Sequence, residues 1–428
     1  AGWRCTRGSC RSPISPASNG LLMSENLKPQ DAAQVAELLT WAGAEEKTVE
    51  LVGAGSKAGL GRPITTDYRL DLSALEGVTL YEPEELVLRA GAATPLGQIQ
   101  AMLAQQRQQL AFEPPDLGDL YQSDQDQTIG GVLSANLAGP RRIKAGAARD
   151  HFLGVEGISG RGEAFKSGGR VVKNVTGYDL CKLMAGSFGT LAALTEVTIK
   201  VLPAPEKVRT VLLFGQDDTA AILAMSQAAG SPHEISALAH LPQAVAARSG
   251  VAYVSGAGAA VTAVRIEGPT PSAAHRTAAM RQQWGALGTV EELHGHNSAT
   301  LWREIGNVAP LLPDTEAVVW KLSVTPSFGA GIMAAALVAG GEGYYDWAGG
   351  LLWLSLPSTN DGGAALVRGA LSGTDAGHAT LMRGPDALRE RIDVFQPSAP
   401  ALAALSARIK DSFDPRRVLN PGRMYGAY

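Results

Sequence analysis

Hydrophobic residues at helical spacing predict the first regular element of the chain, a helix at about 29–41. Val35 and Leu38 share one face, and Pro29 suits the first helical position. The next segments alternate hydrophobic and polar residues or return to helical spacing, which predicts a mixture of strands and helices. They are strands at 48–52 and about 67–72, 86–91 and 194–201, and a helix at 94–110 with Thr94 as its cap and Pro95 at its first position.

The second half of the chain alternates strand-like and alanine-rich helix-like segments, so we expect a separate α+β unit there. Pro203 and Pro205 mark the boundary before it. The strand-like segments are 208–214, 259–268, 318–326 and 351–356, and the helix-like segments are 219–230, 272–285 and 298–308.

The strand at 48–52 runs into a loop with four glycines, Gly53, Gly55, Gly59 and Gly61. Its letters GAGSKA superficially fit a dinucleotide-binding turn, with Asp71 at a suitable distance. That turn must open a helix, which Gly59, Gly61 and Pro63 oppose, and a P-loop fails because Lys57 comes too early. We therefore interpret the loop as a nest of backbone N–H groups suited to a diphosphate, although a plain surface turn has a similar composition.

The stretch TIGGVLSANLAG, residues 128–139, places two glycines before a run of small residues. Gly130 and Gly131 have no Cβ, so a flat or phosphate-bearing ligand could approach the backbone. Thr128 and Ile129 can enter this pair as a strand or a turn. Because a glycine pair is also common in turns and bulges, the flanking motifs decide between the two interpretations.

Length and charge narrow the class of protein. A chain of 428 residues exceeds one ordinary core, so two domains are expected. A net charge of -4 gives no broad basic field, which argues against a nucleic-acid partner. No apolar run reaches the roughly 18 residues that a membrane-spanning helix requires. We expect a soluble, cytoplasmic protein.

Three cysteines, Cys5, Cys10 and Cys181, cannot build a disulfide framework, and no CxxC pair is present to hold an iron–sulfur cluster. If this protein transfers electrons to such a cluster, the cluster must lie in another chain. Residues 1–22 fit neither a secretory signal nor a transit peptide, so we expect a disordered tail and an ordered protein that begins near Met23.

Several motifs in the first half occur together in a specific order. They are the loop at 53–57, EPPD at 113–116, TIGG and SANLAG within 128–139, the pair Arg149-Asp150, KNVTGYDL at 173–180 and GSFGTLAALTEVTIKVLP at 186–203. In this order and approximate spacing they resemble the PCMH-type, vanillyl-alcohol-oxidase-like FAD-binding domain. Within that superfamily the chain resembles the FAD-binding E subunits of glycolate oxidase. The resemblance extends to YYDWAGGLLWL at 344–354 and FDPRRVLNPGRM at 413–424.

The resemblance implies an α+β architecture. A two-part PCMH-type FAD-binding domain would occupy 23–205, an α+β cap domain 206–395, and a C-terminal segment at 396–428 would return to the FAD domain. FAD would be bound non-covalently, because the first loop carries Ser56 and His151 is the only histidine in the flavin half.

The resemblance also assigns cofactor-binding residues. Backbone groups of 53–57 and the side chains of Thr128, Ser134 and Asn136 would surround the diphosphate, and Gly130 and Gly131 would let the isoalloxazine and ribityl chain come close. Asn420 is expected near the flavin ring. The full set is Gly53, Ala54, Gly55, Ser56, Lys57, Pro115, Asp116, Thr128, Ile129, Gly130, Gly131, Ser134, Asn136, Gly139, Gly146, Asp150, Gly189, Val197 and Asn420.

Oxidation of a 2-hydroxy acid requires hydride transfer to the flavin, a cation for the carboxylate and an acceptor for the hydroxyl proton. Arg303 and Lys321 are the candidate cations, unless they are surface charges on a helix and a strand. Metal-dependent relatives use a His-rich motif and a Glu-His-Gly segment, and neither occurs here. His294 and His296 would share one face of a strand without a third ligand, so no metal is expected.

Two functions remain open at this point. The chain is either the FAD-binding subunit of a complex that oxidises glycolate to glyoxylate, or a self-sufficient FAD-linked D-2-hydroxy-acid dehydrogenase of the D-lactate type. The missing metal motif and the few cysteines favour the first. The implied partners are a homologous flavoprotein subunit, an iron–sulfur subunit and a small 2-hydroxy acid. Peripheral association with the inner face of a membrane would come through these partners.

Overall fold

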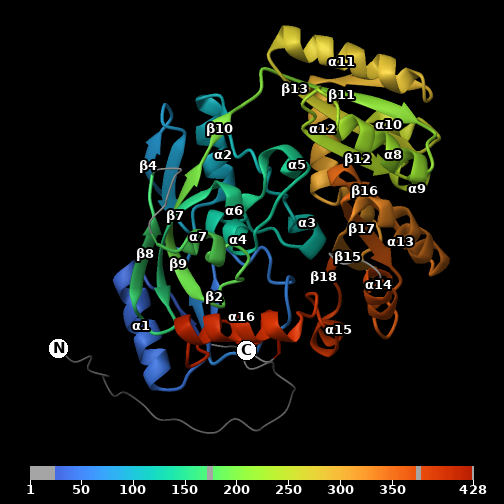
Figure 1. Ribbon diagram of the computed structural model, residues 1–428. Coiled ribbons are helices and arrows are strands. Elements are labelled where there is room, and N and C mark those ends of the chain that lie inside the picture. Colours follow the sequence, from blue (N-terminus) through green and yellow to red (C-terminus); the bar gives the residue numbers. More distant parts are fainter. Residues whose placement is uncertain (1–24, 171–176, 373–376, 427–428) are drawn as a thin grey trace.

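The computed structural model describes residues 25–170, 177–372 and 377–426 (Figure 1). The tail expected at 1–22, with Cys5 and Cys10, lies outside these residues, as do residues 173–176 of the KNVTGYDL motif. Within the described ranges, no helix is both long enough and apolar enough to cross a membrane.

The first part of the chain, which we call the N-terminal lobe, has three sheets among its described residues. A parallel sheet has the order β1-β3-β2, an antiparallel sheet has the order β4-β5-β9-β7-β8, and β6 pairs with β10. The strands are β1 (Glu25–Leu27), β2 (Val49–Val52), β3 (Tyr68–Asp71), β4 (Val78–Glu82), β5 (Val87–Gly91), β6 (Gln108–Gln109), β7 (Phe152–Ser159), β8 (Ala164–Gly168), β9 (Ala192–Lys200) and β10 (Leu202–Pro203).

Helices pack around these sheets, and two of them begin later than the sequence predicts. They are α1 (Ala32–Ala44), α2 (Leu96–Gln105), α3 (Gly118–Tyr121), α4 (Ile129–Ser134), α5 (Arg142–Ala145), α6 (Ala148–His151) and α7 (Leu180–Met184). Helix α1 does not start at Pro29, because the Asp31 side chain accepts the Gln34 N–H and caps it. Pro95 occupies the cap position of α2. Thr94 does not cap it, since its hydroxyl bonds to the turn at Gly77 and Gly91.

The second lobe is built on one antiparallel sheet of eight strands, in the order β14-β11-β13-β12-β16-β17-β15-β18. The strands are β11 (Lys207–Phe214), β12 (Ala237–Leu241), β13 (Val261–Gly268), β14 (Val290–His294), β15 (Val318–Ser323), β16 (Glu342–Asp346), β17 (Leu351–Leu356) and β18 (His378–Arg383). The sequence patterns predict four of them and miss β12, β14, β16 and β18. Strands β12 and β16 are almost wholly buried, so they lack the alternation that identifies a half-exposed strand.

Helices of the second lobe pack on both faces of this sheet. The helices are α8 (Asp218–Ala229), α9 (Gln243–Ala246), α10 (Ala252–Ser255), α11 (Thr270–Gly285), α12 (Gly295–Gly306), α13 (Pro326–Val338) and α14 (Ala364–Leu371), with short 3-10 turns at Ala309–Leu311 and Trp347–Gly349. One apolar cluster joins one face of the sheet to α8, α11, α13 and α14. The opposite face packs against α12 and the N-terminal lobe.

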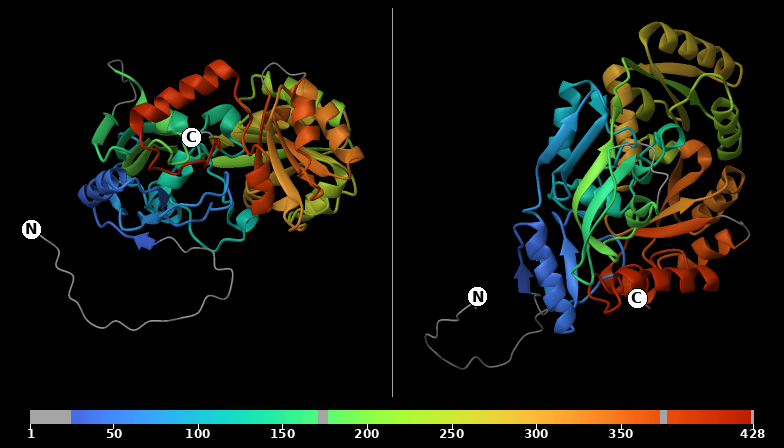
Figure 2. Two further views of the ribbon diagram at one scale, coloured as in Figure 1. Left: turned by 90° about the horizontal axis from the view of Figure 1, so that it is seen from below. Right: turned by 60° about the vertical axis from the view of Figure 1, so that its left-hand side comes forward.

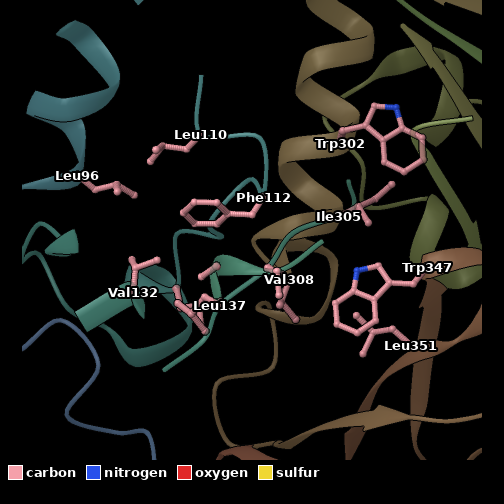
Figure 3. Packing of buried hydrophobic residues seen from close by; sticks show 14 of the residues in the cluster. Leu96, Leu110, Phe112, Val132, Leu137, Trp302, Ile305, Val308, Trp347 and Leu351 are labelled. Atoms are coloured by element: carbon pink, nitrogen blue, oxygen red, sulfur yellow. The ribbon is translucent and has the colours of Figure 1, made fainter. Parts of the chain in front are cut away.

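One apolar cluster extends across both lobes. It contains Val132 and Leu137 from the N-terminal lobe and Ile305, Trp347 and Leu351 from the second lobe. Figure 3 shows these side chains converging where the lobes meet. An ionic contact reinforces the junction, because Arg265 on β13 donates two hydrogen bonds to Glu113 at 2.9 and 2.7 Å. The lobes are therefore packed together, and a cavity between them has defined walls.

After β18 the chain returns to the N-terminal lobe through α15 (Asp386–Arg391) and α16 (Pro400–Phe413). Figure 2 shows α16, in red, at the base of the molecule near the blue N-terminal elements. Leu419 forms a parallel bridge with Val49, and the Asn420 N–H donates to the Val49 carbonyl at 3.0 Å. The expected α+β class with a returning C-terminal segment is thereby confirmed.

Candidate cofactor cleft and adjoining cavity

The main cleft of the N-terminal lobe lies at the end of strand β2. It is an open cleft and holds about 970 Å³ of space free of protein atoms, including the solvent at its mouth. Its walls come from the loop after β2, from α4, from the turn before β9 and from the C-terminal segment. The predicted residues that line it are Gly53, Ala54, Gly55, Ser56, Lys57, Thr128, Gly130, Gly131, Ser134, Gly189 and Asn420.

The loop at 53–57 presents a row of free backbone donors. Among the described residues, none of the five N–H groups from Gly53 to Lys57 has a hydrogen-bond acceptor. Gly55 has φ +79°, a left-handed conformation that turns the backbone without a Cβ penalty. Unpaired amides beside a cleft are a ready site for an anionic group such as a diphosphate.

Positive charge adds to these amides. The ammonium of Lys57 lies 3.2 Å from the Ser56 hydroxyl and 3.4 Å from the Gln127 side-chain oxygen. Within the described part of the chain, no carboxylate lies within 4 Å of it. Burial lowers the pKa of Lys57 to about 8, and the charge of Asp116 opposes that shift. An anion in the cleft would supply the missing counter-charge.

The glycine pair belongs to a helix, which corrects the expectation of a strand or turn. Thr128 is the N-cap of α4, and its hydroxyl accepts the Gly131 N–H at 3.2 Å. Gly130 touches protein backbone, because a Cβ added there would lie 2.6 Å from the Ala92 carbonyl oxygen. A Cβ on Gly131 would face the Lys57 side chain at 3.6 Å. The lack of a side chain at Gly130 therefore lets α4 pack against the backbone at Ala92. The lack of one at Gly131 leaves space in the cleft beside Lys57.

Asn420 holds together the closed end of the cleft. Its side-chain oxygen accepts the Leu51 N–H at 2.8 Å, and its side-chain nitrogen donates to the Phe188 carbonyl at 2.8 Å. It has φ 42°, a conformation that asparagine tolerates better than most residues. Asn420 thus joins β2, the turn before β9 and the C-terminal segment.

The remaining predicted cofactor residues lie outside the cleft lining, and the structure gives several of them structural roles. Asp150 accepts the Ala147 N–H at the start of α6. A Cβ on Gly139 would lie 2.3 Å from the Glu113 carbonyl oxygen, so this glycine permits a close backbone contact. The residues outside the lining are Pro115, Asp116, Ile129, Asn136, Gly139, Gly146, Asp150 and Val197.

A second cavity adjoins the cleft and lies between the lobes. It shares Leu60, Ala135 and Phe188 with the cleft, and Lys321 and Asn136 line it. Burial, then the charge of Arg142, lowers the pKa of Lys321 to about 8, while Asp346 opposes the shift. Lys321 is one of the two cations that the sequence suggests for a substrate carboxylate. Neither Arg142 nor His378 is predicted from the sequence as a site residue.

Arg303, the other candidate cation, does not join them. It is an exposed residue of α12 and lines a different cavity, near Arg141, Arg265 and Glu267. Helix α12 buries Leu301, Trp302 and Ile305 and leaves Arg303 exposed. The two candidates therefore cannot be treated as one site.

The two histidines considered for a metal lie on different elements, which corrects the expectation of a shared strand face. His294 ends β14 and lies 3.0 Å from Glu292, whereas His296 lies in α12. Across the described ranges, no group of three or more His, Cys, Asp or Glu side chains is arranged to hold a metal ion.

Comparisons with known proteins agree with this geometry. The FAD binding domain family matches residues 26–168. Glycolate oxidase subunit GlcE of Escherichia coli (strain K12) is 32% identical over 373 residues, which cover 87% of this chain and 91% of that protein. Glycolate oxidase subunit GlcD of Bacillus subtilis (strain 168) is 40% identical over 111 residues, covering 26% of this chain and 23% of that protein.

Solved structures show the same fold at low identity. The structure of p-cresol methylhydroxylase with substrate bound superposes with a TM-score of 0.68 and 13% identity, covering 94% of this chain and 89% of that one. The unpaired amides of the loop and the ammonium of Lys57 suit the FAD diphosphate, and Ala192 and Leu194 offer an apolar wall. The cofactor is FAD. With a match over nearly the full length of both proteins, the chain belongs to the GlcE family of FAD-binding glycolate oxidase subunits.

Proposed function

We propose that this protein is the FAD-binding subunit of a complex that oxidises glycolate to glyoxylate and passes the electrons to an iron–sulfur subunit. The observation that carries the proposal is that the FAD cleft lies next to a cavity lined by cations, with Leu60, Ala135 and Phe188 in the walls of both. A carboxylate substrate in that cavity would lie beside the flavin. The similarity to GlcE supports glycolate as the substrate class.

The residues of this chain have separable tasks in the proposed site. The amides of 53–57 and the Lys57 ammonium would hold the diphosphate, and Asn420 fixes the cleft wall. Bound FAD supplies an acceptor for hydride. The cleft-lining residues that the structure describes include no histidine or cysteine, which supports non-covalent binding.

Electron transfer beyond the flavin is proposed to need another chain. Clusters held by thiolates commonly use four cysteines, and this sequence has three. A homologous flavoprotein subunit is the second proposed partner, because the named relatives GlcE and GlcD are both subunits of a glycolate oxidase. These assignments favour a cytoplasmic complex that reaches a membrane only through its partners.

The test of this function is dye-linked oxidation of glycolate by the FAD-loaded single chain and by the reconstituted complex. We expect at least tenfold faster turnover in the complex, because the complex adds a homologous flavoprotein subunit that can oxidise glycolate and an iron–sulfur subunit that can pass the electrons to the dye. D-Lactate serves as the competing substrate. Equal turnover by the single chain would instead support the alternative, a self-sufficient D-2-hydroxy-acid dehydrogenase.

A further prediction concerns Lys57. Lys57→Met should weaken FAD binding by roughly 10- to 100-fold, the effect of losing a charge-assisted hydrogen bond of about 1.5–3 kcal/mol. Without ligand the pKa of Lys57 is about 8, and a bound diphosphate would raise it. Affinity should therefore be constant below pH 8 and fall as the pH rises above it. Equilibrium titration monitored by flavin fluorescence measures both effects.

Two controls separate this effect from a general loss of structure. Riboflavin lacks the diphosphate, so its affinity should change little in Lys57→Met. Lys47, an exposed residue near Asp67, provides a matched variant, Lys47→Met, that should bind FAD normally. An equal loss of riboflavin affinity would assign Lys57 to the flavin ring instead.

A further inference from the structure

Two neighbouring strands present a polar patch toward the N-terminal lobe. Strands β15 and β18 pair in a register that places Lys321 opposite Thr380 and Ser323 opposite His378. Residues two apart on a strand face the same side, so these four side chains share one face. The intervening Trp320 and Leu322 are buried in the opposite apolar layer. A polar cluster has therefore been built on an inner face of the sheet.

The N-terminal lobe adds a second cation across the cavity. Arg142 of α5 and Lys321 both contact the ring of Trp347, at 4.6 and 5.1 Å from its centre. Trp347 is fixed in place, because its ring nitrogen donates to the Gly139 carbonyl at 3.0 Å. The indole thus holds two cations from different lobes at the edge of one cavity.

These two cations lack close counter-charges. Among the described residues, neither Arg142 nor Lys321 has a carboxylate within 4 Å. The negative groups that act on them are Asp150, which caps α6, and Asp346, whose pKa burial raises to about 7. Lys321 is partly buried, whereas Arg142 is exposed at the edge of the cavity, so a bound carboxylate would chiefly offset the desolvation of Lys321.

His378 supplies a different kind of group. His378 is an exposed residue at the start of β18, and partial desolvation, then the charges of Lys321, Arg142 and Arg368, lowers its pKa. The imidazole is consequently neutral near pH 7, and one ring nitrogen can accept a proton or a hydrogen bond from a hydroxyl group. Ser323 and Thr380 provide hydroxyl groups beside it. The cavity therefore combines carboxylate-binding and hydroxyl-binding groups.

We propose that this cavity is a binding site for a small hydroxy acid, with the carboxylate held between Arg142 and Lys321 and the hydroxyl directed toward His378 and Ser323. The proposal rests on the proposed function and deepens it, because it gives this subunit a substrate site of its own. No metal ion is required, since the positive charges of Arg142 and Lys321 bind the carboxylate.

The test is calorimetric titration of the FAD-loaded chain with oxalate, which has no C–H bond and so cannot be oxidised by hydride loss. We expect oxalate to bind, and Arg142→Met and Lys321→Met each to weaken binding by roughly tenfold or more. The double variant should not bind. Lys144→Met, on the same short helix but with an exposed side chain near Glu234, is the matched control and should bind normally.

A second comparison tests the hydroxyl contacts. With the flavin reduced beforehand under anaerobic conditions, so that glycolate cannot be oxidised, His378→Phe and Ser323→Ala should weaken the binding of glycolate while leaving acetate, which lacks the hydroxyl, unchanged. Retained circular dichroism and retained FAD show that each variant is folded. The fluorescence of Trp347 gives a further measure of oxalate binding, because it should change when the cation contacts of the ring are displaced.

The outcomes separate this proposal from the proposed function. If the chain retains FAD but oxalate does not bind, or binds equally to Arg142→Met and Lys321→Met, the hydroxy-acid site is overturned while the FAD-binding role stands. If Arg303→Met weakens binding and Lys321→Met does not, the site lies in the other cavity and the proposal is wrong. If the chain does not retain FAD, the proposed function itself fails.

Discussion

Replacing Lys410 by methionine is expected to lower the free energy of unfolding by about 3–5 kcal/mol, the usual cost of breaking a buried ion pair. Lys410 and Asp414 are 1% and 0% exposed and lie 2.6 Å apart. The ammonium also donates to the carbonyls of Thr190 and Leu419. Without it, Asp414 would be a buried charge with no cation beside it.

The same change should loosen the cofactor. Asp414 accepts the N–H groups of Val418 and Leu419, and these residues position Asn420 in the cleft wall. Urea unfolding and the dissociation constant of FAD measure the two effects. Asp411→Asn removes an exposed ion pair with Arg417 in the same segment, and it should cost less than about 1 kcal/mol. If Lys410→Met were as stable as the wild type, the buried ion pair of the C-terminal segment would not stabilise the fold.

The second large effect is expected at the glycine pair. Gly130→Val should abolish FAD retention. Even a Cβ at this position would lie 2.6 Å from the Ala92 carbonyl oxygen, so α4 would be displaced from its packed position. Overpacking of this kind costs typically about 1–3 kcal/mol, and more for a branched side chain against backbone. Flavin absorbance after gel filtration, together with the unfolding midpoint, measures the outcome.

Gly131→Val should act differently. A Cβ there lies 3.2 Å from the Thr128 hydroxyl and faces Lys57, so stability should fall less while the cleft narrows. Gly97→Ala is the control, since no atom lies within 4 Å of the added Cβ and alanine favours a helix. A folded Gly131→Val protein with stoichiometric FAD would remove Gly131 from the cofactor site.

Local sequence determined much of the cofactor cleft. The glycine-rich loop after a strand predicts free amides at 53–57, and the described structure has five of them unpaired. Gly189 and Asn420 also line the cleft as the resemblance implies. The free amides could be predicted because a turn and its backbone donors depend on residues that are adjacent in the chain, whereas Gly189 and Asn420 were assigned only through the resemblance.

Tertiary contacts changed the interpretation of the glycine pair. Two glycines oppose helix formation locally, so the sequence did not predict α4. The helix forms because Thr128 caps it and because Gly130 packs against Ala92 from another segment. The same limit applies to Gly139, whose close contact with Glu113 was not visible in the sequence.

The second cavity shows most clearly what the sequence determined and what only the tertiary structure decided. Alternation in VVWKLS determined that Lys321 lies on the face of β15 opposite Trp320. Only strand pairing and lobe packing brought His378 and Arg142 to that face, and only the tertiary structure placed Arg303 in a different cavity. Periodicity specifies which side of its own element a residue occupies. Convergence of residues from distant segments depends on register and packing, which are fixed by contacts across the whole fold.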